Sequence, residues 1–169
     1  MVRDKWRVIL ASAFGLGLSP IVPGSCAALL GVLIYVVVAK TVNVSLQVPV
    51  LVLFFLFTCI GNHLLTPWAQ KYWKNKDPKQ FVLDEIAGYL LVPILFRHGQ
   101  LWQVAFWGYL GFRTLDVIKV PPAWQIDKYG TGAWAILMDD IVSGMYTVFG
   151  LYIMKWVGPI IGVERWFIC

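Results

Sequence analysis

Two pairs of neighbouring carboxylates adjoin apolar segments of the chain: Asp84 and Glu85 in "DEIAG", and Asp139 and Asp140 in "MDDIVSG". A single carboxylate near a helix N-terminus is ordinary, because it caps free amides and the helix dipole favours it by about 0.3–1 kcal/mol. Two like charges in a row repel each other, however, and a cap needs only one of them. We therefore predict that each pair lies at a helix start just outside the hydrocarbon, facing a cation that offsets the repulsion.

A further acid stands between two basic residues in "FRTLDVIK". Arg113, Asp116 and Lys119 are spaced i, i+3 and i+6, which on a helix places them along one side. One interpretation is a salt-bridged helix end. In the functional interpretation, Asp116 binds a metal ion and the two basic residues bind a phosphate group, because a guanidinium fork and a mobile ammonium both bind phosphate oxygens well.

Carboxylate clusters without Cys or His ligands suit hard cations, above all Mg²⁺, which prefers oxygen ligands and commonly bridges to substrate phosphates. The cysteines and histidines show no metal-binding spacing, so zinc is not expected. We predict one or two Mg²⁺ ions, with Asp127 as a further ligand or an orienting group. The predicted ligands are Asp84, Glu85, Asp116, Asp127, Asp139 and Asp140. The same acids without Asp127, together with Lys119, are the predicted catalytic residues.

The stretch "GLGLSPIVPGS" (15–25) is rich in Gly and Pro and predicts a loop. Glycine lets backbone amides approach an anion closely, as they do at phosphate sites on helix N-termini. We predict that Ser19, Gly24 and Ser25 join Arg113 and Lys119 in binding the substrate phosphate. Ser19 or Ser25 is also a candidate cap for the helix that follows.

The composition indicates a membrane protein. Of the 169 residues, 59% are hydrophobic and only 14% are charged, and the mean hydropathy is +0.72. The net charge of +5 comes from basic residues scattered between apolar segments. Because they form no dense basic stripe, the expected partner is the lipid bilayer and not nucleic acid.

Five apolar segments predict four or five membrane helices, at residues 25–39, 48–65, 86–96, 101–118 and 133–157. The first and third are shorter than the roughly 20 residues that span a bilayer. Residues 6–20, interrupted by Gly and Pro, predict a half-inserted or interfacial helix followed by a loop. The expected fold is all-α: one polytopic helical bundle over residues 1–169, with short interfacial helices.

The basic residues also predict an orientation. If the N-terminus is cytoplasmic and five segments alternate, most of the basic residues fall inside, and only Lys40, Arg97, Lys155 and Arg165 fall outside, in agreement with the positive-inside bias. The predicted metal ligands then gather on the cytoplasmic face. An ionised side chain costs about 2.5–3.5 kcal/mol at the bilayer centre, so acids kept beside a membrane indicate water, a partner or a metal.

The motifs "GLGLSPIVPGS", "DEIAG", "FRTLDVIKVPPAWQID" and "MDDIVSG" together resemble the phosphatidylglycerophosphatase A family in order and spacing. This resemblance covers most of the chain. It implies a Mg²⁺-dependent phosphatase of the bacterial inner membrane that converts phosphatidylglycerophosphate to phosphatidylglycerol. Val120 and Trp124 depart from the family pattern, which usually has a proline and a basic residue there; these changes concern the shape of the phosphate pocket and leave the acids in place.

Two alternatives belong to other classes. A small transporter or ion channel could use the acids as a cation path, but transport favours acids at several depths and often inverted halves, and no internal repeat is visible. A CDP-alcohol phosphotransferase also uses acids with Mg²⁺, but its Asp-Gly-x-x-Ala-Arg signature is missing. The sequence leaves open the oligomeric state, the number of metal ions, and the choice between direct water attack and a phospho-aspartyl intermediate.

Overall fold

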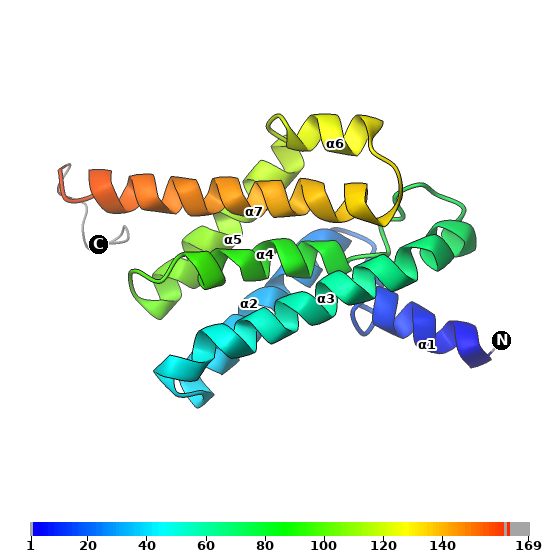
Figure 1. Cartoon of the computed structure of the whole chain (residues 1–169), viewed down its shortest axis with the longest axis horizontal. Coiled ribbons are helices and arrows are strands. Elements are labelled where there is room, and N and C mark those ends of the chain that lie inside the picture. The colour runs from blue at the N-terminus through cyan, green and yellow to red at the C-terminus, as the bar shows by residue number, and fades with distance from the viewer. Residues whose placement is uncertain (1, 161, 163–169) are drawn as a thin grey trace.

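The computed structural model describes residues 2–160 and 162, and the side chains from residue 4 onward. Every regular element in this part of the chain is a helix (Figure 1), which confirms the predicted all-α fold class. The elements are α1 (Val2–Ala11), the short 3₁₀ helix η1 (Leu16–Leu18), α2 (Pro23–Thr41), α3 (Val44–Trp73), α4 (Leu83–Leu95), α5 (Leu101–Ile118), α6 (Ala123–Tyr129) and α7 (Gly132–Val157).

Local sequence breakers set the ends of the long helices. Helix α2 begins at Pro23, because the first turn of a helix does not need the N–H that proline lacks. Lys74 and Lys119 end α3 and α5 in the left-handed conformation, at φ 53° and 52°. Pro121 and Pro122 then follow α5 and stop the helix from continuing. The predicted apolar segments therefore all become helices, with bounds that move by a few residues or, in α3, by a turn or two.

Among the described residues, α2, α3 and α7 are long and apolar enough to cross a membrane. Helix α4 has only 13 residues, about 20 Å of helix against a hydrocarbon core of about 30 Å. It is instead enclosed by its neighbours: the side chains of Tyr89, Leu90 and Val92 are fully buried, and Figure 1 shows α4 inside the bundle. Where the sequence predicted four or five spans, the bundle has three helices of spanning length, with α4 and α5 packed against them.

Helices α4 and α7 approach each other at two glycines. A Cβ added to Gly144 would lie 2.5 Å from the carbonyl oxygen of Gly88, and one added to Gly88 would lie 2.9 Å from the carbonyl oxygen of Asp140. Both helices begin at the same end of the bundle (Figure 1). Because Asp84 and Asp140 each lie one turn before one of these glycines, the close crossing places the two acidic pairs side by side.

Gly144→Ala is expected to destabilise the protein, because the new methyl group would push α7 away from the Gly88 carbonyl. Overpacking of this kind costs about 1–3 kcal/mol. Gly150→Ala is the matched control on the same helix, since a Cβ there meets nothing within 4 Å. Thermal unfolding in detergent should show a lower midpoint for Gly144→Ala and an unchanged or higher midpoint for Gly150→Ala. Equal midpoints for the two variants would show that the crossing tolerates a methyl group.

The bundle has two ends (Figure 1), which differ in the charged residues that they carry. We call one the acidic end: it holds α1, α6, the starts of α2, α4 and α7, and the last turns of α3 and α5. The opposite end holds the turn between α2 and α3, the hairpin between α4 and α5, and the last turn of α7. Lys40, Arg97 and Lys155 lie there, as predicted for the outside cations, whereas Arg165 lies outside the described residues. Which end faces the cytoplasm stays a prediction.

Candidate active site

The two acidic pairs meet in the interior of the acidic end, not at its surface. Asp84, Asp139 and Asp140 are only 6%, 6% and 3% exposed. The prediction that Asp139 and Asp140 begin a helix is wrong, because α7 starts about two turns earlier at Gly132. The backbone turns at Gly132, with φ 76°, and the apolar residues that follow continue the helix without a break. The pair therefore projects from within α7 toward α4 and α5.

Lys119 connects three elements of the site. Its Nζ donates to Asp139 Oδ2 at 2.8 Å and lies 3.0 Å from Asp127 Oδ1, which α6 holds above α7. Burial alone would lower the pKa of Lys119, but the hydrogen bonds and charges of Asp139 and Asp127 outweigh it and raise the pKa, so the side chain stays a cation. The expected row of three charges along one helix is wrong here, because α5 ends at Ile118 and Lys119 turns away from Asp116.

Arg113 organises the other side of the cluster. Its Nη1 donates to Asp116 Oδ2 at 2.6 Å and lies 3.8 Å from Glu85 Oε1, while its Nε donates to Ser25 Oγ at 3.2 Å. Gly24 is part of the same arrangement, because any side chain there would collide with the Glu85 carboxylate. The missing Cβ lets this carboxylate reach the N-terminal turn of α2, where the helix dipole favours a negative charge.

The serines of the 15–25 stretch do not cap α2. Its N-cap is Val22, without a side-chain bond, and Ser25 lies inside the helix as its third residue. The cap prediction is therefore wrong, because Pro23 starts the helix earlier than the last serine. Ser19 follows η1, where its backbone N–H donates to Leu16 O. Among the described residues the structure brings Gly24 and Ser25 to the acids and gives the Ser19 hydroxyl no bond to them.

A seventh carboxylate, Asp77, lies in the loop between α3 and α4 and was not among the predicted site residues. This side chain lies close enough to Lys119, Asp127 and Asp116 for electrostatic interaction. Its position in a short polar stretch, among the lysines assigned to the same face, was the clue that could have identified it. Asp77 thus extends the acidic cluster toward solvent, above the buried pairs.

Several carboxylate oxygens in the cluster lack a partner. Asp84 Oδ1, Glu85 Oε2 and Asp139 Oδ1 are buried without a hydrogen bond. Burial, followed by the charge of neighbouring acids, raises the pKa of Asp84 well above its usual range. Burial also raises the pKa of Glu85 to about 8, against the lowering effect of Arg113. The acids of the cluster outnumber its two cations, and in the described part of the chain no three of the candidate ligand side chains are already arranged to hold one ion.

The sequence model of the family described as Phosphatidylglycerophosphatase A matches residues 9–155. The chain belongs to this family. The match spans the 15–25 stretch, both acidic pairs, and the Arg113 and Lys119 cations, so every predicted site residue lies within it. Membership in the phosphatidylglycerophosphatase A family places the chain among phosphatases that act on membrane lipids.

Three curated relatives cover nearly the whole chain. Phosphatidylglycerophosphatase A of Escherichia coli is 32% identical over 151 residues, which are 89% of this chain and 84% of the relative. The putative phosphatidylinositol-3-phosphatase of Bacteroides thetaiotaomicron is 26% identical over 159 residues, 89% of this chain and 94% of the relative. Phosphatidylglycerophosphatase A of Haemophilus influenzae is 24% identical over 151 residues, 88% of each chain. No solved structure matches the chain.

Proposed function

We propose that this chain removes the terminal phosphate of phosphatidylglycerophosphate in a Mg²⁺-dependent reaction and leaves phosphatidylglycerol and inorganic phosphate. The observation that carries the proposal is the meeting of buried carboxylates and two cations at one end of a membrane bundle. The family assignment supports a lipid phosphatase. We further propose that the acidic end faces the cytoplasm of a bacterial inner membrane, where the headgroup reaches the site while the acyl chains stay in the bilayer.

The unpartnered carboxylate oxygens fit a hard divalent cation. Asp84 and Glu85 are neighbours on α4, Asp139 and Asp140 come from α7, and Asp116 comes from α5, so the ligands would reach the ion from three helices. Asp127 on α6 would be a further ligand or would orient Lys119. When bound, Mg²⁺ supplies charge that polarises a phosphoryl group and lowers the pKa of a coordinated water. These side chains would have to reorient, because in this structure the described ligands do not converge on one point.

The two cations act on the substrate phosphate. Arg113 and Lys119 now neutralise Asp116, Asp127 and Asp139. Once those carboxylates have another positive partner, the guanidinium fork and the ammonium become available to hold phosphate oxygens and to stabilise the charge that develops on them. The backbone amides at the start of α2 lie beside Arg113, and Ser25 fixes the direction of its side chain.

The substrate headgroup is the point on which the curated relatives differ, since one is named for a phosphoinositide and two for phosphatidylglycerophosphate. We expect the purified chain to release phosphate fastest from phosphatidylglycerophosphate, and only with Mg²⁺. The measurement compares this lipid with phosphatidylinositol 3-phosphate and a soluble phosphomonoester, each with Mg²⁺ and with a chelator. Faster release from the phosphoinositide would overturn the substrate, and unchanged release under chelator would overturn the metal. Ion flux in liposomes without phosphate release would support the transporter alternative.

A further inference from the structure

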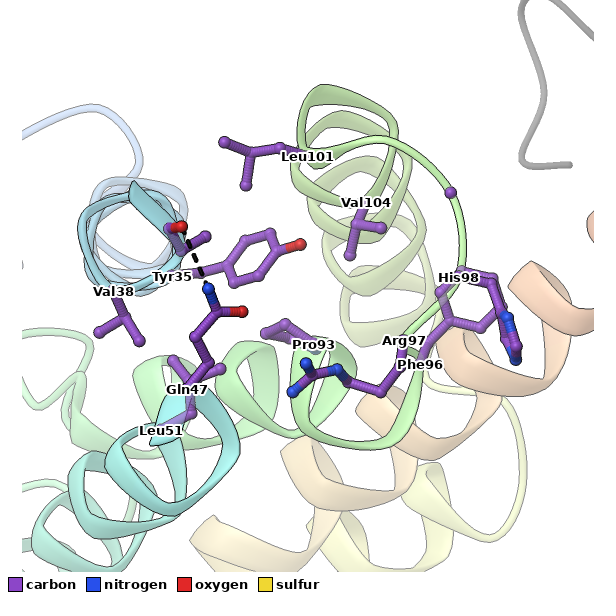
Figure 2. Close-up of a pocket in the computed structure, with 12 residues that line it drawn as sticks. Tyr35, Val38, Gln47, Leu51, Pro93, Phe96, Arg97, His98, Leu101 and Val104 are labelled. Carbon is purple, nitrogen blue, oxygen red and sulfur yellow. Dashed lines mark hydrogen bonds between the residues drawn. The ribbon is translucent and has the colours of Figure 1, made fainter. Parts of the chain in front are cut away.

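A second polar site lies at the opposite end of the bundle (Figure 2). A pocket of about 220 Å³ is lined by the last turns of α2, the first turns of α3, the hairpin after α4, and the start of α5. The length of α4, about 20 Å, separates it from the acidic pairs. The cavity is therefore distinct from the candidate active site.

Arg97 is the cation of this cavity. Figure 2 shows its side chain turned back from the hairpin to lie below Pro93, on the side of α3. His98 points away and packs against the rings of Phe96 and Tyr152, with centroids 5.6 and 5.9 Å apart. All described acids lie on elements of the acidic end, and Arg97 has no ion pair with a described residue. Among the described residues its guanidinium therefore lacks an ion-pair partner, and it lies in a cavity that apolar side chains also line.

Two neutral groups complete the polar lining. Gln47 Nε2 donates to the carbonyl oxygens of Ala39 and Val42, both at 3.1 Å. These bonds fix the amide so that its oxygen faces the cavity as an acceptor (Figure 2). The Tyr35 side chain extends from α2 toward α5, and its hydroxyl is near enough to Arg97 for electrostatic interaction. The cavity therefore offers a fork-shaped cation, a hydroxyl and a carbonyl acceptor.

We infer that this cavity binds a phosphate group, carried by a phospholipid headgroup or present as free phosphate. The guanidinium fork matches phosphate oxygens in two-point geometry. The carbonyl oxygen of Gln47 can accept from a hydroxyl or ammonium group next to the phosphate, which phospholipid headgroups carry. Because one water occupies about 30 Å³, the cavity has room for a phosphate with such a substituent. Its position at the end of the membrane helices is where headgroups lie.

The test compares wild type, Arg97→Gln and Arg97→Lys, with Lys40→Gln as the matched control, because Lys40 is a cation at the same end that does not line the cavity. Each purified full-length chain is titrated in detergent with dioleoylphosphatidylglycerol and, separately, with inorganic phosphate. The thermal midpoint and the lipid retained in native mass spectrometry are recorded. Lipid that binds at the acidic end contributes equally to all variants. The difference in lipid binding between wild type and the Arg97 variants therefore measures binding in the cavity.

We expect Arg97→Gln to weaken binding by roughly tenfold or more, since it loses a charge-assisted hydrogen bond. Arg97→Lys should be intermediate, and Lys40→Gln should behave like wild type. Stabilisation by the lipid alone assigns the site to a headgroup, and stabilisation by inorganic phosphate with the same dependence on Arg97 assigns it to free phosphate. Equal responses of wild type and Arg97→Gln to both probes would overturn the inference. Release of phosphate from a soluble phosphomonoester should be unchanged in Arg97→Gln, which separates this result from any failure of the proposed function.

Discussion

Asp140→Asn is expected to lower phosphate release from phosphatidylglycerophosphate by at least about 10²-fold while the protein remains folded. Asp140 is 3% exposed and faces the carboxylates of Asp116 and Asp84. Its ionised form is therefore stable only if these carboxylates share a cation. Asparagine keeps the size of the side chain and removes the charge. Loss of one preorganised electrostatic group typically costs about 10²–10³ in rate.

The same substitution should have the opposite effect on stability without metal. Asp140→Asn removes one of several like charges that are buried together, so the thermal midpoint in chelator should stay equal or rise. The stabilisation that Mg²⁺ gives to wild type should shrink in the variant. Asp4→Asn on α1 is the control, a carboxylate outside the cluster, and should keep both activity and the response to Mg²⁺. Full activity of Asp140→Asn, or a loss of activity that merely follows a loss of fold, would contradict the assignment.

The sequence predicted the helices well because their boundaries depend on local chemistry. Long apolar stretches must satisfy their backbone groups internally beside lipid, which leaves helix as the available structure. Proline at 23 and the prolines at 121 and 122 then fix where helices begin or end. The same membrane constraint sorted the acids, because charged groups near a bilayer gather where water, partners or metals meet them.

The packing that assembles the site was not predictable in this way. The approach of α4 to α7 depends on Gly88 and Gly144, which are 56 residues apart in the sequence and act only as a pair. Their crossing brings Asp140 on α7 beside Asp84 on α4. Lys119 was assigned to the same side as Asp116 because a continuing helix was assumed, but the left-handed turn at its own position moves it toward Asp127 on α6.

Arg113→Lys should reduce phosphate release by about 10- to 100-fold, and Arg113→Gln by more. The arginine donates from Nη1 to Asp116 at 2.6 Å and from Nε to Ser25 at 3.2 Å, and one ammonium group does not reproduce this fork. The lysine variant keeps the positive charge, so its loss of activity measures the contribution of the guanidinium geometry. The glutamine variant also removes the charge, so its loss measures the charge and the geometry together. Steady-state rates on phosphatidylglycerophosphate give the comparison, with thermal midpoints to confirm folding.

Ser25→Ala tests whether the serine acts through Arg113. In wild type the substitution removes one hydrogen bond that holds the guanidinium, and we expect a loss of about fivefold, the equivalent of roughly 1 kcal/mol. In the Arg113→Lys background there is no Nε to hold, so Ser25→Ala should have little further effect, and the two changes should be non-additive. Additive losses would mean that Ser25 contacts the substrate phosphate directly, as its position at the start of α2 also allows. The two roles predict the same loss for Ser25→Ala alone and different losses for the double variant. The activity of the double variant therefore separates a serine that positions Arg113 from one that binds the phosphate.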